Sequence, residues 1–425
     1  MNTLQMKKYI ADGGINATLT HIYGEAAIDM QKARYSAAID EFAAIYGADR
    51  EITLYSVAGR SELSGNHTDH NCGCVVAASI DLDIIAVASK RDDNVIAIKS
   101  EGFPEDVVDF ASYNAPVESK FGSSASIIAG MVQGFLKDGY AVGGFDAYTT
   151  SNVLKGSGLS SSAAFEDMVG NILSHMYNDG KVDNVEIAKL AQYAENVFFG
   201  KPCGLMDQVA CAVGGIVAID FKDPKAPVIN KVDFDISAAG YNLCIVNTGG
   251  NHADLTDDYA AIRVEMNSVA EYFGKSVLRE VEPADVFANM GEIRKKTGDR
   301  ALERAIHFYN ENSRVERLTS ALDKEDFDEF KSIIIESGKS SYMYNQNCFT
   351  LKNPDSQPVA LALCLTEELL KGKAAYRVHG GGFAGTIQVF LPKSEIENYT
   401  TQMKKVFGEN SCYILSVRSH GGCEI

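Results

Sequence analysis

A run of glycines and serines at residues 155–164, KGSGLSSSAA, is the segment of this sequence best suited to chemistry. Gly156 and Gly158 have no Cβ, so backbone N–H groups there can approach an anion closely. The serines add hydroxyls that can bond a phosphate oxygen or a magnesium ion. A strand expected at 147–154 precedes the run, and a helix expected at 163–177 would direct its N-terminal dipole at the anion. The segment predicts a phosphate-binding loop.

The sequence of this loop leaves a second interpretation open. The loop is not a Walker A loop, because no Gly-Lys-Ser or Gly-Lys-Thr ends it, and it is not a GxGxxG dinucleotide turn. A turn with serine caps and no ligand would have a similar composition. The choice between the two depends on the other motifs of the chain.

The overall charge restricts the partners that such a loop could serve. The chain has 425 residues and a formal net charge of −18, which repels phosphate backbones and anionic lipid. Neither nucleic acid nor a membrane is therefore expected as a partner, although local dipoles and a metal ion can still hold ATP. The N-terminus lacks the apolar core of a signal peptide, and no apolar run is long enough to span a bilayer. Nine scattered cysteines are typical of reduced thiols, so we expect a cytoplasmic protein.

Helices and strands are expected to alternate irregularly. Apolar residues at helical spacing predict helices at 25–46, 126–136, 163–177, 187–198, 358–371 and 394–407. Strands are predicted at 52–58, 84–89, 95–99, 147–154, 216–221, 243–247, 386–391 and 413–417. Because a steady Rossmann alternation is missing, the expected fold class is α+β. Two prolines and little periodicity place a domain boundary near 222–239.

Four motifs occur in the order found in one family of enzymes. They are GRSELSGNHTDHN at 59–71, the loop at 155–164, PCGLMDQ at 202–208 and GGGFAG at 380–385. Together they resemble the motifs of galactokinases, which belong to the GHMP small-molecule kinases. The resemblance spans about residues 35–420. It implies an N-terminal extension at 1–34, a ribosomal-protein-S5-like domain at 35–230 and a ferredoxin-like domain at 231–425, with the active site between the two domains.

The resemblance also implies a reaction and roles for named residues. ATP would transfer its γ-phosphoryl group to the C1 hydroxyl of galactose, with Mg²⁺ present, in a monomer or a weak homo-oligomer. Asp207 would act on that hydroxyl as a base or as an orienting anion, and Arg60 would keep Asp207 ionised. Ser162 and Glu195 would hold the metal. The sugar would contact Asn66, His67, Asp69, Gly204, Tyr259 and Gly381, and the phosphates would contact Gly156, Ser157, Gly158, Leu159, Ser160, Ser161, Ser162 and Ala163.

A zinc site is the competing interpretation of the first motif. His67, Asp69, His70, Cys72 and Cys74 stand close together in the sequence. Their spacing does not match a C-x₂-C pair, and no second cluster would complete a tetrahedral site. The sugar signature is the better interpretation.

The first motif departs from the usual galactokinase pattern, GRVNLIGEHTDYN. This chain has Ser61, Glu62, Ser64, Asn66 and His70 in place of Val, Asn, Ile, Glu and Tyr. Elsewhere Leu154 stands where the family commonly has proline, and His379 stands where it has threonine.

Asn66 is the informative change. In the family a glutamate accepts a hydrogen bond from the O6 hydroxyl there, whereas asparagine also offers an N–H donor. We therefore keep an altered C6, as in galacturonate, as an alternative to galactose. A sensor that binds sugar and ATP without turnover is a third alternative. The presence of Arg60, Asp207 and the serines at 160–162 argues against it.

Overall fold

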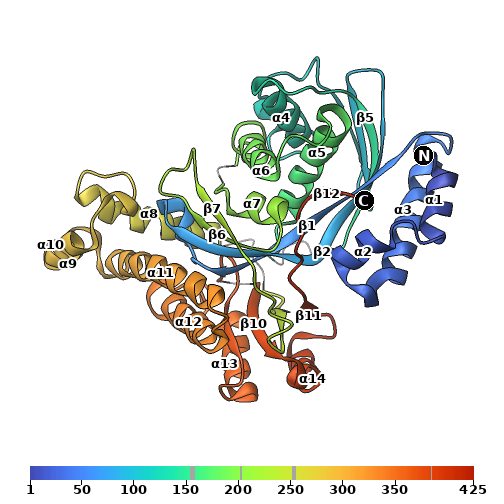
Figure 1. Cartoon of the computed structure of the whole chain (residues 1–425). Coiled ribbons are helices and arrows are strands. Elements are labelled where there is room, and N and C mark those ends of the chain that lie inside the picture. The colour runs from blue at the N-terminus through green and yellow to red at the C-terminus, as the bar shows by residue number, and fades with distance from the viewer. Residues whose placement is uncertain (154–157, 202, 251–254, 384) are drawn as a thin grey trace.

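The computed structural model describes residues 1–153, 158–201, 203–250, 255–383 and 385–425 (Figure 1). Two sheets that are largely antiparallel combine with helices. This arrangement confirms the expected α+β class.

The larger sheet has eight strands and is built around the long strand β2 (Cys74–Lys90). β2 pairs antiparallel with β1 (Thr53–Ser64), with β5 (Phe145–Ser151) along its second half and with β6 (Ile216–Asp220) along its first. Four strands extend the sheet at its edges: β3 (Val95–Ser100), β4 (Glu105–Asp109), β7 (Val228–Val232) and β12 (Cys423–Glu424). The strand that precedes the phosphate loop, β5, is thus held inside this sheet.

Helices cover both faces of this sheet. Successive residues of a strand point to opposite faces, so Tyr55 and Ala86 pack into one core while Leu54 and Val87 pack into another. The first core is completed by α4 (Ser124–Lys137), α5 (Ser161–Asn178) and α6 (Asn184–Tyr193), and the second by α1 (Thr3–Ala11), α2 (Asn16–Tyr23) and α3 (Ile28–Tyr46). Figure 1 shows α1–α3 as a separate layer beside the strands.

The N-terminal helices are an integral layer of this domain. The boundary expected between residues 34 and 35 falls inside α3, because apolar residues of this helix cover the sheet. The buried Asp83 of β2 accepts hydrogen bonds from Arg34 of α3 at 2.5 Å and from Arg418 at 3.0 Å. It also accepts one from the hydroxyl of Tyr23 in α2. Asp83 therefore joins the extension, the sheet and the C-terminal segment.

The smaller sheet has the order β11-β8-β10-β9, with β8 (Tyr241–Asn247), β9 (Ala375–Val378), β10 (Thr386–Pro392) and β11 (Cys412–Leu415). One face packs against α13 (Pro358–Leu370) and α14 (Ile396–Phe407). The other face shares a core with the larger sheet, α11 (Asp299–Asp323) and α12 (Phe327–Ser340). A further helical cluster combines α11 with α8 (Thr256–Tyr272), α9 (Pro283–Ala288) and α10 (Met290–Thr297).

The division at residues 230 and 231 does not separate the two sheets cleanly. That boundary lies within β7, which still belongs to the larger sheet. β12 returns from the far end of the chain to pair with β1, with Tyr55 opposite Glu424. The larger sheet is therefore built from both ends of the sequence.

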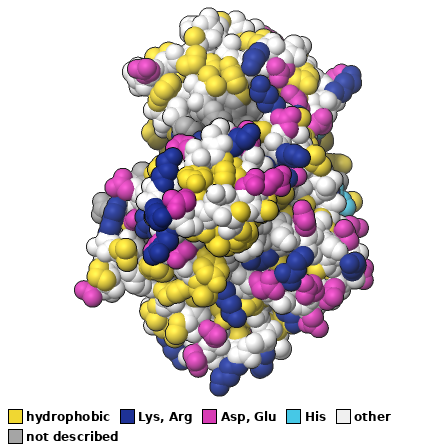
Figure 2. All heavy atoms as spheres, turned by 90° about the vertical axis from the view of Figure 1, so that its left-hand side faces the viewer, with side chains coloured by type: hydrophobic (Ala, Val, Ile, Leu, Met, Phe, Trp, Pro, Cys, Tyr) yellow, Lys and Arg dark blue, Asp and Glu magenta, His cyan; other side chains and the backbone are white. Residues whose placement is uncertain are grey.

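The surface mixes charges of both signs. Figure 2 shows Lys and Arg side chains interspersed with Asp and Glu and with apolar patches over one face. Among the helices of the described ranges, none combines the length and apolar character needed to cross a membrane.

Candidate active site

Arg60 of β1 and Asp207 of α7 (Met206–Val213) form an ion pair at the centre of the site. The Nε and Nη2 atoms of Arg60 each donate to one carboxylate oxygen of Asp207 at 2.8 Å. Burial lowers the pKa of Arg60, but the Asp207 carboxylate outweighs burial, and the net shift of this pKa is upward. Arg60 is 6% exposed and the Asp207 side chain 36%. The pair thus presents a carboxylate to the open side of the site with a fixed cation behind it.

The phosphate loop is attached directly to this pair. Arg60 donates through Nη1 to the carbonyl of Gly158, and its backbone N–H donates to the carbonyl of Leu159 at 3.1 Å. Ser160 has a left-handed backbone (φ +60°) just before α5, and its hydroxyl donates to Asp207 at 2.5 Å. Sequence reasoning placed these residues in a loop but did not foresee the bond between Ser160 and Asp207.

The first turn of α5 points the free N–H groups of a helix toward the same region. Ser161, Ser162 and Ala163 form this turn, and N–H groups at a helix start have no partner within the helix. They are suited to phosphate oxygens. The predicted contacts Gly156 and Ser157 lie outside the described residues.

A cavity of about 110 Å³ opens beside Asp207. Both predicted metal ligands, Ser162 and Glu195, line it. Glu195 lies in the π-helix η4 (Ala194–Phe199) and accepts hydrogen bonds from Lys201 at 3.2 Å and from Gln208 at 2.9 Å. One hydroxyl and one carboxylate are hard oxygen donors of the kind that Mg²⁺ prefers, together with water and substrate phosphates. The donor set fits this ion.

Sequence reasoning missed Glu166, a buried carboxylate that lies behind the cavity and is linked to Glu195 through Gln208. Glu166 is buried in α5 and accepts from Gln208 Nε2 at 3.0 Å, so it shares this amide with Glu195. Burial, with Glu195 as the next cause, raises the pKa of Glu166 to about 8. Helical spacing could have identified it, because Ser162 and Glu166 stand four residues apart on one face of α5.

Asp69 lines the same cavity, and Gly204 makes room for it. A Cβ on Gly204 would lie 2.4 Å from Oδ2 of Asp69. A side chain at this position would have to displace the Asp69 carboxylate, whereas the resemblance implied a contact of Gly204 with the sugar. Burial, with Asp207 as a further cause, raises the pKa of Asp69 to about 6.

His67, Tyr259 and Gly381 meet on the side of the C-terminal glycine motif. The carbonyl of Gly381 accepts from His67 at 3.0 Å, so Nε2 of that ring carries the proton. Burial lowers the pKa of His67, which favours the neutral ring. The hydroxyl of Tyr259 donates to the carbonyl of Gly382 at 2.8 Å, and a Cβ on Gly381 would lie 2.4 Å from the Tyr259 ring. His67 and Tyr259 thus hold the glycine motif in place.

The position of Asn66 corrects its predicted role. The side chain is fully buried, and its amide nitrogen donates to Glu62 at 3.0 Å and to the carbonyl of Gly380 at 2.8 Å. Its oxygen accepts from Ser341 at 3.1 Å and from Asn347 at 2.8 Å. Both donors and both acceptor positions are occupied, so Asn66 offers no free group to a sugar.

The partners of Asn66 form a buried network between the two sheets. Arg377 of β9 pairs with Glu62 at 2.8 Å and donates to the carbonyl of Leu63 at 2.8 Å. His307 of α11 lies 2.9 Å from the backbone oxygen of Asn66. Of these residues, sequence reasoning singled out Glu62 and Asn66, as departures from a pattern. No motif in the sequence around Arg377 or His307 indicates that these residues belong to the site.

Two family models match the chain. The GHMP kinases N terminal domain matches residues 127–215, which include the phosphate loop and Asp207. The galactokinase galactose-binding signature matches residues 40–90, which include Arg60 and Asp69.

Individual relatives match over most of their length. The galactokinase of Streptomyces coelicolor is 29% identical over 372 residues, which cover 87% of this chain and 92% of the relative. The galactokinase of Lactobacillus helveticus is 31% identical over 367 residues, which cover 82% and 88%. The solved structure of Lactococcus lactis galactokinase complexed with galactose has a TM-score of 0.77 at 23% identity and covers 92% of this chain and 100% of that chain. The motifs, the fold and these matches agree, and the chain belongs to the galactokinase family of the GHMP kinases.

Proposed function

We propose that this chain is an ATP-dependent galactose 1-kinase. The observation that carries the proposal is the bidentate pair of Arg60 and Asp207, joined by Ser160 at the start of α5. Phosphoryl transfer depends mainly on positioning and on charge stabilisation. This pair places an orienting carboxylate and a cation beside a helix N-terminus that suits phosphate.

In the proposed reaction, the C1 oxygen of galactose attacks the γ-phosphorus of ATP while the bond to the bridging β,γ-oxygen breaks. Asp207 orients the C1 hydroxyl or accepts its proton, and Arg60 faces the charge of the moving phosphoryl group. The products are galactose 1-phosphate and ADP. Ser162 and Glu195 would hold Mg²⁺, which supplies charge neutralisation on the phosphates when bound.

Asp69 is proposed as an acceptor for sugar hydroxyls, because its carboxylate lines the same cavity as Asp207. We propose a positioning role for Asn66, His67, Gly204, Tyr259 and Gly381. Nothing in the contacts of Asn66 favours a C6 carboxylate, so galactose is preferred over galacturonate. We further propose that the enzyme works in the cytoplasm, which its nine free thiols support. The assembly that we propose is a monomer or a weak homo-oligomer.

The test is ADP release with galactose and galacturonate, together with product analysis. We expect a higher kcat/KM for galactose and a phosphate on C1. Asp207→Asn should lower kcat by about 10³-fold while ATP binding measured by calorimetry persists. Sugar and ATP binding without ADP release in the unaltered protein would instead identify a sensor, and equal turnover by Asp207→Asn would contradict the assigned role.

A further inference from the structure

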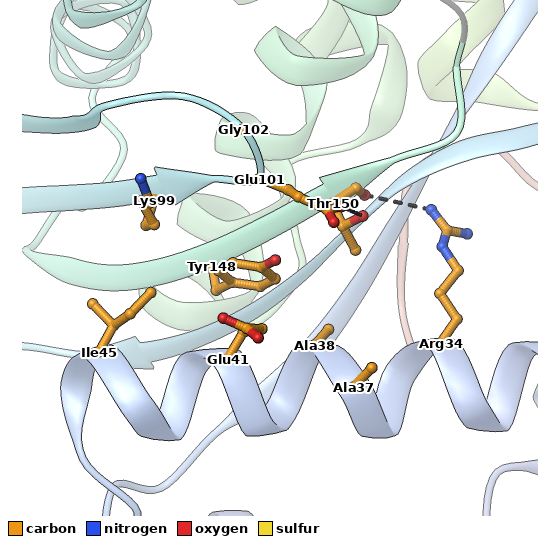
Figure 3. Close-up of a pocket in the computed structure, with 10 residues that line it drawn as sticks. All are labelled: Arg34, Ala37, Ala38, Glu41, Ile45, Lys99, Glu101, Gly102, Tyr148 and Thr150. Carbon is orange, nitrogen blue, oxygen red and sulfur yellow. Dashed lines mark hydrogen bonds between the residues drawn. The ribbon is translucent and has the colours of Figure 1, made fainter.

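The catalytic cavity differs in its charges from a larger cavity of about 460 Å³, which lies between α3 and the strands β3 and β5 (Figure 3). The larger cavity is lined by two cations and two carboxylates: Arg34, Lys99, Glu41 and Glu101. Figure 3 shows the cations at opposite ends and the carboxylates between them, so these charges balance. Of the described residues that line the catalytic cavity, one carries an ammonium group, Lys201, and three carry carboxylates: Asp69, Glu195 and Asp207.

The two carboxylate oxygens of Glu195 are held in different ways. Oε2 accepts from Gln208 at 2.9 Å, and the same amide donates to the buried Glu166 at 3.0 Å. Oε1 is paired with Nζ of Lys201 at 3.2 Å. The Glu195 side chain is 5% exposed, whereas that of Lys201 is 65% exposed. The bond to Gln208 is thus fixed in the interior, and the bond to Lys201 is the one that can be exchanged.

Lys201 is suited to changing its partner. An exposed ion pair costs side-chain entropy and adds little stability, and the four-carbon stem of lysine lets its ammonium group turn toward another anion. Burial lowers the pKa of Lys201, but the Glu195 carboxylate outweighs burial, and the net shift of this pKa is upward. The group therefore remains a cation at neutral pH.

The role proposed for Glu195 requires such an exchange. A divalent cation held by Glu195 would lie beside the ammonium group of Lys201, and like charges so close repel each other. Ser162, in the first turn of α5, lines the same cavity of about 110 Å³. The phosphates expected at this helix start are therefore within a short movement of Lys201.

We propose that Lys201 exchanges partners in each reaction cycle. It holds Glu195 while metal and nucleotide are absent, and it turns to a phosphate oxygen of ATP when both are bound. Lys201 would then face the charge of the phosphates from the Glu195 side of the cavity. This inference rests on the proposed function, because it needs Mg²⁺ and ATP in this cavity.

The exchange at Glu195 is tested by titrating the nucleotide-free full chain with Mn²⁺, followed by electron paramagnetic resonance. Mn²⁺ takes the same oxygen donors as Mg²⁺. Lys201→Met removes the competing cation but keeps a long side chain, so it should tighten Mn²⁺ binding about tenfold. Lys201→Arg keeps the charge and should not tighten it.

The exchange toward ATP is tested by initial rates. Lys201→Met should lower kcat/KM for ATP about tenfold, and Lys201→Arg should recover part of this loss. Lys181→Met is the matched control, because Lys181 is also an exposed lysine paired with a carboxylate, that of Asp179, and does not line the cavity. It should alter neither Mn²⁺ binding nor the rates.

Three results would overturn the exchange: Mn²⁺ affinity in Lys201→Met equal to that of the unaltered chain, an unchanged kcat/KM for ATP in this variant, or no Mn²⁺ binding to the nucleotide-free chain. ADP release by the unaltered chain with galactose separates these results from a failure of the proposed function. If ADP is released, the kinase assignment stands and only the role of Lys201 is wrong.

Discussion

At the scale of residues, the distinctive feature is the exchange of a carboxylate and an amide. The galactokinase pattern has asparagine and then glutamate at the positions where this chain has Glu62 and Asn66. The two side chains are bonded at 3.0 Å, and Arg377 neutralises Glu62. One carboxylate and one amide are thus retained in a buried network, with their order reversed.

This exchange predicts strong coupling between the two positions. Asn66→Glu places a second carboxylate beside Glu62 and should destabilise the fold by about 3 kcal/mol. The double variant Glu62→Asn/Asn66→Glu restores one carboxylate and should recover most of that loss. Urea unfolding of all four members of the cycle measures the coupling. Additive losses would show that the two side chains act independently.

Asp69 predicts a pH dependence of sugar use. Its pKa is raised to about 6, so the carboxyl gains a proton as the pH falls through 6 and loses acceptor capacity for the sugar hydroxyls that we propose it binds. The kcat/KM for galactose should fall about tenfold per pH unit below that value. Asp69→Asn should have low activity, and its kcat/KM should not show this fall below pH 6. If Asp69→Asn shows the same fall, the titration belongs to another group.

At the scale of elements, the N-terminal helices act through Asp83. Burial acts to raise the pKa of Asp83, but Arg34 and Arg418 together hold it below its usual range. A carboxyl with a depressed pKa stabilises the fold above its unfolded pKa, near 4, and this contribution is lost as the pH falls through the folded pKa. The attachment of α1–α3 to the sheet is therefore expected to be sensitive to acid.

Asp83→Asn should leave two arginines without their shared anion and lower the free energy of unfolding by about 3–5 kcal/mol at pH 7. The difference from the unaltered chain should shrink as the pH falls below about 4. Urea unfolding at both pH values measures it. As a matched control, Asp40→Asn removes an exposed carboxylate paired with Lys7 and should cost less than about 1 kcal/mol.

Local patterns predicted the elements and motifs better than their assembly. Helical periodicity located α5, and the Gly/Ser run located the loop before it, because both signals are local. The strands β9 and β12 were missed, since runs of four and two residues carry little periodicity. The role of Asn66 could not be predicted because its partners Ser341, Asn347 and Gly380 are distant in sequence.

At the scale of the whole molecule, a net charge of −18 opposes the approach of an anionic nucleotide. Positive groups at the site, such as Arg60, act at short range, whereas the net charge acts over the Debye length. This length falls from about 30 Å at 0.01 M salt to about 8 Å at 0.15 M.

Added salt should therefore make it easier for ATP to approach and bind the enzyme. Between these two salt concentrations, kcat/KM for ATP should rise about threefold, while kcat/KM for the neutral galactose stays constant. Initial rates with each substrate varied in turn measure the effect. A fall with salt would mean that local cations dominate the encounter.

The pairing of β12 with β1 has a consequence for how the chain is made. Synthesis on the ribosome delivers β1 early, but its edge partner at Cys423–Glu424 and the Arg418 that contacts Asp83 come last. Asp83 can pair with Arg34 early, but it gains this second cation only after the second sheet has been synthesised. The first domain to emerge is thus the last to be completed. Pulse-labelled chains stalled before residue 418 should remain sensitive to protease in β1 and α3.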